Sequence, residues 1–208
     1  MDTFNDGSLK FSQLHLGKSL LDVTRMAKGA AAYTPSSGLL FRHTEFKPFN
    51  RLFNHWSAIG IPQHLGNNTK PDCSCAMNSC ACFCIDPCKP HGQAVKHIAW
   101  CVKATTEEGL IFKPNSLNPV LDCHVDTDFA GNWNLKDAKD PSGVKSQISY
   151  LLTFGGVPLF WCSVTQKCIA LSTEESRCIA LSAAMHGLVH VRTLLSKISA
   201  KFNLAYWD

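Results

Sequence analysis

Apolar side chains recur at helical spacing through the first half of the chain, which predicts a mostly helical region. Residues 8–27 favour a short helix interrupted by Gly17. Glycines, prolines and polar residues over 28–54 indicate an irregular connection. Small and apolar residues then return, broken by Pro62, and those after Pro71 predict a helix that runs to about Ile85.

A second helix and a short strand are predicted next. Asp86 and Pro87 mark the end of the preceding helix, and Pro90 fits the first turn of the following one. In the segment HGQAVKHIAWCVKAT, alanine, valine and isoleucine side chains fall on one side of a helix. The strand LIFKP follows Gly109.

From about residue 120 the pattern becomes strand-like. VLDCHVDTDFAG predicts a strand, and a charged, turn-rich stretch continues to Gly143. SQISYLLTFGGVPLFWCSV predicts a hairpin with Gly155-Gly156 as its turn. CIAL predicts a short strand, and Ser172 or Thr173 is a candidate N-cap for a long amphipathic helix. The apolar positions of that helix include Ile179, Leu181, Ala184, Leu188, Val191, Leu194, Leu195 and Ile198.

Composition bounds the class of protein. With 208 residues and 45% apolar side chains, the chain can hold one domain, or one and a half, around a real core. A net charge of +4 permits contact with a polyanion without requiring it. No signal-like start is present, and the longest apolar run, over 150–162, is too short to span a bilayer. We therefore expect a soluble intracellular protein, cytoplasmic or nuclear, with no membrane partner and no small-molecule substrate.

The most informative residues are Asp126 and Asp128 in HVDTDFAGNW. Spacing alone favours two solvated carboxylates at the end of a strand. However, a short carboxylate pair after an apolar strand is also how two-metal nuclease sites begin, and the Phe129-Ala130-Gly131 that follows, together with the downstream hairpin, favours an inherited metal site.

These residues carry a family resemblance. VDTDFAGNW, the hairpin and IALSTEESRCIALSAA together resemble the ribonuclease H region of copia-type retrotransposon Pol polyproteins. Upstream, HWSAIGIPQHLGNNTKPDCSCAMNSCACF and DPCKPHGQAVKHIAWCVKATTEEGLIF resemble the segment that joins polymerase to nuclease. The resemblance implies a mostly helical connection segment over 1–117. A truncated α/β ribonuclease H-like domain would then occupy 118–208, with three strands and a first helix.

In function, the resemblance implies a nuclease that cuts the RNA strand of RNA/DNA hybrids with Mg²⁺ held by carboxylates. Asp126 matches the first metal ligand, and Asp128 is its neighbour on the same face. Alignment puts Glu175 on the first glutamate of the family phrase and Arg177 on the second, which binds metal. A guanidinium there reverses the local charge and repels Mg²⁺. The chain also stops at Asp208 before a recognisable third carboxylate strand, so we predict no appreciable nuclease activity.

Two alternatives stay open. Cysteines and histidines cluster in the first half, which suggests a zinc site, although Cys-x-Cys pairs on a probable helix diverge and free thiols are the commoner outcome. That cluster comprises Cys73, Cys75, Cys80, Cys82, Cys84, Cys88, His91, His97 and Cys101. The other alternative is a residual nucleic-acid-binding module, with Lys136, Lys139 and Lys145 facing a phosphate backbone. An incomplete sheet would also leave an uncovered edge and favour aggregation.

Overall fold

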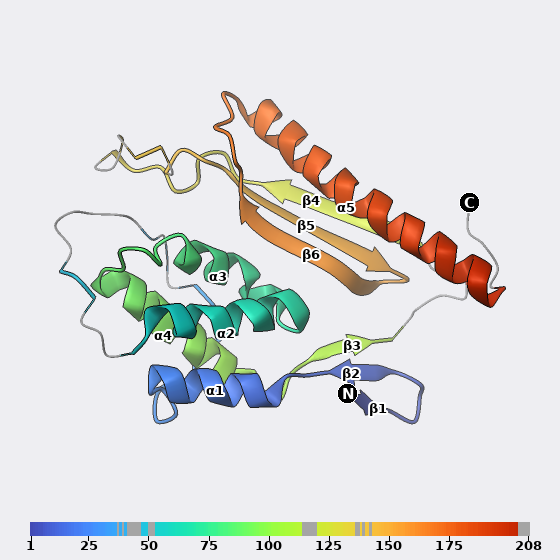
Figure 1. Ribbon diagram of the computed structural model, residues 1–208, viewed down its shortest axis with the longest axis horizontal. Helices are drawn as coiled ribbons and strands as arrows, with labels where there is room; N and C mark the ends of the chain where they lie inside the picture. Colours follow the sequence, from blue (N-terminus) through green and yellow to red (C-terminus); the bar gives the residue numbers. More distant parts are fainter. Residues whose placement is uncertain are drawn as a thin grey trace.

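The computed structural model describes residues 1–36, 38, 40, 47–49, 53–113, 120–135, 138, 140–141 and 143–203. Within these residues the fold is α/β, with two three-stranded antiparallel sheets and five α-helices. Figure 1 shows a helical group, α1–α4, beside the second sheet, with the long helix α5 lying along the other side of that sheet. The first sheet lies below the second sheet in the same view.

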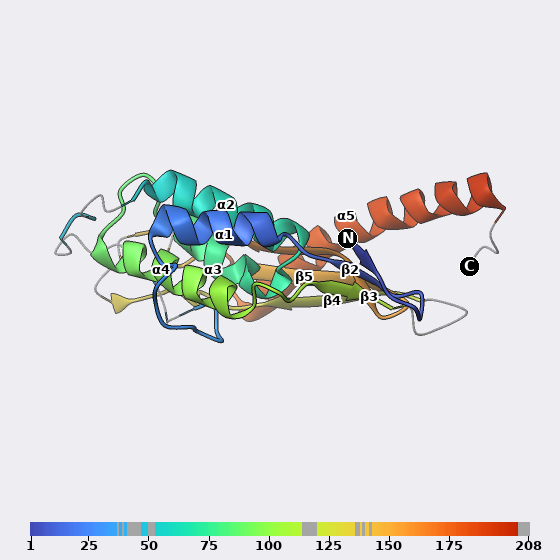
Figure 2. The ribbon, with the colours of Figure 1, turned by 90° about the horizontal axis from the view of Figure 1, so that it is seen from below.

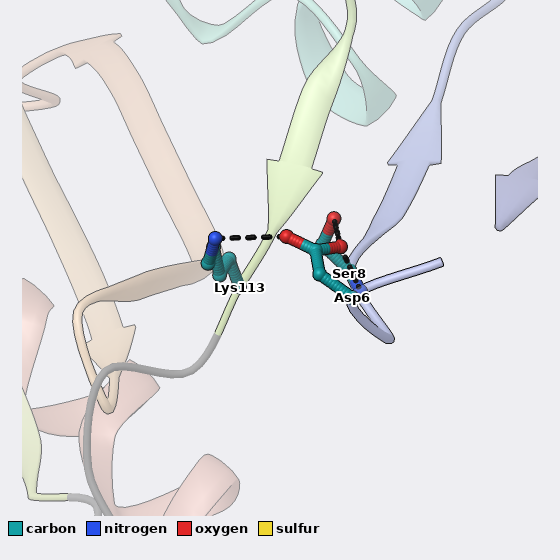
Figure 3. Close-up of polar contacts among 3 residues, drawn as sticks. All are labelled: Asp6, Ser8 and Lys113. Atoms are coloured by element: carbon teal, nitrogen blue, oxygen red, sulfur yellow. Dashed lines mark hydrogen bonds and ion pairs between the residues drawn. The ribbon is translucent and has the colours of Figure 1, made fainter. Parts of the chain in front are cut away.

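The first sheet joins the N-terminus to residues more than a hundred positions later. Its strands β1 (Asp2–Thr3), β2 (Leu9–Phe11) and β3 (Leu110–Phe112) pair in that order. An exposed ion pair of 2.8 Å joins Lys113 to Asp6, whose carboxylate also accepts hydrogen bonds from Ser8 (Figure 3). The hydrogen bond from Lys113, with those from Ser8, holds the pKa of Asp6 well below its usual range.

The main core lies among four helices, α1 (Leu14–Thr24), α2 (His55–Asn68), α3 (Ser74–Ala81) and α4 (Lys89–Ala104). A 3₁₀ turn, η1 (Pro71–Cys73), connects α2 to α3. Large side chains from all four helices are at most 2% exposed, including Leu20, Leu65, Met77, Val95 and Ile98. Burial of such side chains contributes about 1.5–3 kcal/mol each, which makes this cluster the chief source of stability in the first half.

Three local expectations from the sequence are wrong. Gly17 lies buried inside α1 and does not interrupt it. Pro62 lies within an unbroken α2, where its own burial and that of neighbouring apolar residues offset the lost backbone hydrogen bond. The helix after Pro71 ends at Ala81, four residues before the expected end at Ile85. The start of α4, with Pro90 in its first turn, is confirmed.

The second sheet has the predicted hairpin. Strands β4 (Leu121–Thr127), β5 (Gln147–Phe154) and β6 (Val157–Thr165) are all antiparallel. Gly155 and Gly156 have φ values of 58° and 79°, which suits the tight turns that glycine permits between strands. The short strand expected at CIAL is wrong, because no strand among the described residues pairs with that segment, and its Leu171 is 86% exposed.

Helix α5 (Thr173–Phe202) covers one face of the second sheet with small residues. Ala180 and Ala184 are buried, and Gly187 lies over Tyr150 and Phe160, where an added Cβ would come within 3.3 Å of the Tyr150 ring. Burial raises the pKa of Tyr150 to about 12. In Figure 2 the second half of α5 extends beyond the sheet.

Most large apolar side chains of the predicted long helix, α5, do not pack on the sheet. Six of them are exposed: Leu181, Met185, Val189, Leu194, Ile198 and Phe202. Among the described residues, α5 is also the one helix long and apolar enough to cross a membrane, judged by length and composition alone. Core helices and signal sequences of soluble proteins pass that same test, so it is weak support for a membrane span.

Candidate functional site

Asp126 lies near the end of β4, on the sheet face that turns away from α5. Alternation along β4 puts Thr127 on the opposite face, where its hydroxyl lies 3.0 Å from the hydroxyl of Ser176 in α5. Asp126 instead shares its face with its register partner Ser149 and, one strand further, with Ser163. Its carboxylate is exposed and accepts a hydrogen bond of 2.9 Å from the Thr127 amide.

A cavity of about 440 Å³ opens beside Asp126, between the second sheet and the segment that starts at η1. Sheet residues on its wall include His124, Tyr150 and Trp161, and Asp72 and Cys75 line the opposite side. The Trp161 indole donates a 2.6 Å hydrogen bond to the Gly66 carbonyl of α2, which ties the sheet to the helical group next to this cavity. Sequence patterns do not predict this link, because Trp161 and Gly66 are far apart along the chain.

Asp128 closes the end of the β4–β5 ladder. Its carboxylate accepts a hydrogen bond of 2.5 Å from the Gln147 amide, and its backbone carbonyl accepts one of 3.1 Å from the Ser176 hydroxyl. Ala130, just after it, has a positive φ of 50°, and Gly131 packs against the Asp128 carboxylate so closely that a Cβ would collide with it. The Asp-Phe-Ala-Gly sequence therefore has a structural role as a chain reversal at the end of the strand.

Glu175 forms hydrogen bonds that cap the beginning of α5. Ser172, one of the two predicted candidates, is the N-cap, and its hydroxyl accepts a 3.1 Å hydrogen bond from the Glu175 amide. The Glu175 carboxylate in turn accepts a 2.7 Å hydrogen bond from the Leu171 amide. This reciprocal arrangement resembles a capping box and satisfies two backbone amides at the helix start. Hydrogen bonds from its own amide and from the Thr173 and Ser172 hydroxyls lower the pKa of the neighbouring Glu174.

Ser176 holds the start of α5 on the sheet, and sequence reasoning missed it. It is fully buried, and its hydroxyl contacts Thr127, the carbonyl of Asp128 and the side-chain amide of Gln166. Gln166 also donates to the Ser176 carbonyl at 3.0 Å. One signal was available, because Ser176, Ala180 and Ala184 recur every four residues and form a small-residue face that allows close approach to a sheet.

The predicted site residues are not brought together. Asp126 lies near the end of β4, and Asp128 directly follows that strand. Glu175 caps the start of α5, and Arg177, two residues later, is exposed. Among the residues that the structure describes, the one group of three potential metal ligands within 4.8 Å of one another is Asp72, Cys73 and Cys101. That group lies in the helical half of the chain.

The cysteines of the first half are dispersed. Buried cysteines lie in or beside the helical core, none of them in a disulfide: Cys73, Cys80, Cys84, Cys88 and Cys101. Cys75 and Cys82 are exposed. Of the lysines proposed to face nucleic acid, Lys145 is partly buried, and Lys136 and Lys139 lie outside the described residues.

Comparison with known proteins relates this sequence to retrotransposon Pol polyproteins and to a secreted effector. The chain is 32% identical over 142 residues to the retrovirus-related Pol polyprotein from transposon TNT 1-94 of Nicotiana tabacum, and 27% identical over 144 residues to that from transposon RE1 of Arabidopsis thaliana. The matches cover 68% and 69% of the chain. It is also 32% identical over 143 residues to the secreted RxLR effector protein 161 of Plasmopara viticola. The similarity to transposon proteins over about two thirds of the chain supports a retrotransposon Pol-derived sequence.

This Pol-derived chain corresponds to a small part of the polyproteins and to most of the effector. It spans about a tenth of the length of the TNT 1-94 and RE1 polyproteins, and 94% of the effector. No family model matches the sequence, and no solved structure matches it. The resemblance to transposon Pol proteins is thus confirmed, whereas the copia type and the ribonuclease H region stay predictions.

Proposed function

We propose that this chain is the connection segment and opening part of a ribonuclease H-like domain from a copia-type Pol polyprotein, and that it does not cut RNA/DNA hybrids. The proposal keeps the division near residue 117. On this view the helical group with the first sheet is the connection segment, and β4, β5, β6 and α5 are the start of the nuclease domain. Nucleic acid, an RNA/DNA hybrid above all, is the partner that this origin implies.

The order of elements after residue 120 supports the domain assignment. Three antiparallel strands joined in sequence are followed directly by one long helix that packs on β4 and β5. The polar contact at Ser176 fixes that helix across the end of the first strand, next to the Asp-x-Asp segment. A ribonuclease H-like domain opens with this same order of elements and with a carboxylate at this place on its first strand.

The donor set supports the absence of cleavage and carries the proposal. A pair of divalent ions needs several carboxylates that converge on one point, with oxygens free to bind. Here the carboxylates of Asp126, Asp128 and Glu175 each accept a hydrogen bond from a backbone amide, and they do not converge. Asp126 and the Ser176 hydroxyl lie on opposite faces of β4. These residues do not fit the Mg²⁺ pair of the family, and the exposed Arg177 adds a repelling positive charge.

A cleavage assay tests the proposal. The full 208-residue chain is incubated with a labelled RNA/DNA hybrid and Mg²⁺ or Mn²⁺, alongside Asp126→Asn as the matched control. We expect the two proteins to release the same background amount of RNA fragments. Metal-dependent cleavage that is present with the unmodified chain and lost with Asp126→Asn would refute catalytic inactivity.

The proposed Pol origin predicts where the protein is found, and the similarity to the secreted effector suggests a second candidate function. We propose an intracellular location, as for a Pol-derived fragment. The alternative, favoured by the 94% coverage of the secreted effector, is that this sequence acts as a secreted, effector-like protein. Expression of the tagged full chain in cells distinguishes them: retention of the tag in the lysate supports the first, and accumulation in the medium supports the second.

A further inference from the structure

Asp72, Cys73 and Cys101 form a compact group of metal-binding atoms where η1 meets α4. The carboxylate oxygen and the two sulfur atoms lie within 4.8 Å of one another. The Cys73 thiol donates to the Asp72 carboxylate, with 3.5 Å between Sγ and Oδ2. In a tetrahedral zinc site with bonds of about 2.3 Å to sulfur and 2.1 Å to oxygen, these two atoms are about 3.6 Å apart. The spacing of this hydrogen-bonded pair therefore also suits two ligands on one ion.

Burial makes this group different from an exposed cluster. Cys73 and Cys101 are 0% and 1% exposed, whereas Asp72 is exposed and lines the cavity of about 440 Å³ next to the second sheet. The cavity offers a path from solvent to the carboxylate, with both thiols behind it. Burial raises the pKa of Cys73 and of Cys101, so both sulfurs carry protons in the metal-free chain.

Nearby charges suit a divalent cation bound by thiolates. Two thiolates and one carboxylate leave one net negative charge around such an ion. The ammonium group of Lys70, itself only 7% exposed, lies near Cys101 and is held by a 2.5 Å hydrogen bond to the Thr105 carbonyl. This charge neutralises the excess. Sulfur ligands also select borderline and soft metals such as zinc over magnesium or calcium.

We propose that Asp72, Cys73 and Cys101 bind one zinc-class divalent ion, with the fourth coordination position open toward the cavity. The two thiol protons pass to solvent as the metal–sulfur bonds form, and no electrons are transferred. The site joins η1 to α4 and therefore stabilises the helical group. It is independent of the carboxylates near β4 and of the proposed Pol origin.

Cobalt(II) is the probe for the test, because thiolate-to-cobalt charge-transfer absorption reports sulfur ligands directly. The reduced, metal-free full chain is titrated with Co²⁺ and then with Zn²⁺. Four exposed cysteines could bind metal on their own, so the same titration uses a variant in which Cys75, Cys82, Cys168 and Cys178 are all replaced by serine. We expect one Co²⁺ per chain, the same absorption in this variant, and displacement by Zn²⁺.

Two further variants assign the ligands. Cys101→Ser should abolish the charge-transfer absorption of one sulfur ligand, with circular dichroism as the check that the helices remain. Asp72→Asn leaves the core intact because the side chain is exposed, and it should weaken Co²⁺ binding by about tenfold or more, since loss of even an outer-shell partner costs about 10- to 100-fold. Three results would each overturn the proposal. The first is no charge-transfer absorption from sulfur ligands in the unmodified chain, and the second is loss of that absorption when the exposed cysteines are replaced. The third is an unchanged Co²⁺ affinity in Asp72→Asn.

Discussion

Replacement of Ser176 by alanine should destabilise the contact between α5 and the second sheet. The Ser176 hydroxyl is fully buried and lies 3.0 Å from the Thr127 hydroxyl, 3.1 Å from the Gln166 amide nitrogen and 3.1 Å from the Asp128 carbonyl. Gln166 keeps its bond to the Ser176 carbonyl, and Thr127 keeps the Gln147 carbonyl as an acceptor. The Asp128 carbonyl loses the Ser176 donor but still has the Thr127 hydroxyl 3.0 Å away, so the change removes hydrogen bonds without leaving a group unpartnered.

The magnitude follows from these contacts. Each hydrogen bond contributes about 0.5–1.5 kcal/mol net, so loss of the one that Ser176 donates and the one that it accepts costs about 1–3 kcal/mol, and alanine regains about 0.5 kcal/mol through its higher helix propensity. The free energy of unfolding should therefore fall by about 0.5–2.5 kcal/mol. The measurement is a urea titration followed by circular dichroism, in which the midpoint should decrease while the slope stays the same.

Ser182→Ala is the matched control, because Ser182 is exposed on the same helix. It should leave the midpoint unchanged or raise it slightly through helix propensity alone. If Ser176→Ala behaves like Ser182→Ala, the hydroxyl network at the end of β4 does not hold α5, and the reasoning is refuted.

Three further predictions concern other parts of the chain. His55 is buried with neither ring nitrogen hydrogen-bonded, and burial lowers its pKa from 6.5. The unfolded chain therefore binds the proton more tightly than the folded chain, so the free energy of unfolding should be highest above pH 6.5 and fall as the pH drops through that value. In urea titrations at several pH values, His55→Phe should reduce this dependence of the free energy of unfolding on pH. Trp161→Phe removes the hydrogen bond to the Gly66 carbonyl and should lower the free energy of unfolding by about 1 kcal/mol. Amide hydrogen exchange should accelerate more in β6 than in α4. Equal acceleration in both elements would contradict a local effect of this hydrogen bond. Lys113→Ala breaks an exposed ion pair and should leave the thermal midpoint unchanged within error, so a clear decrease would show that the first sheet depends on that pair.

Local patterns in the sequence determined much of the second half of the fold. Glycine at two consecutive positions between apolar strands specifies a tight turn, because only the turn needs positive φ, and the hairpin at Gly155-Gly156 follows. Ser172 fulfils its role as an N-cap through a contact only three residues away. Pro90 likewise lies in the first turn of α4. In each case the interacting groups are neighbours in sequence, so the sequence contains the whole interaction.

The candidate site depended on tertiary structure. The sequence shows that Asp126, Asp128 and Glu175 are carboxylates, but not that one oxygen of each accepts a hydrogen bond from a backbone amide or that Asp126 turns away from α5. Register and helix placement decide those directions, because a strand alternates its side chains between two faces and only packing selects which face a helix covers. The same holds for Cys73 and Cys101, which are distant in sequence and meet only because α4 packs beside η1. The sequence supplied the chemical groups, and the folded chain decided which of them meet.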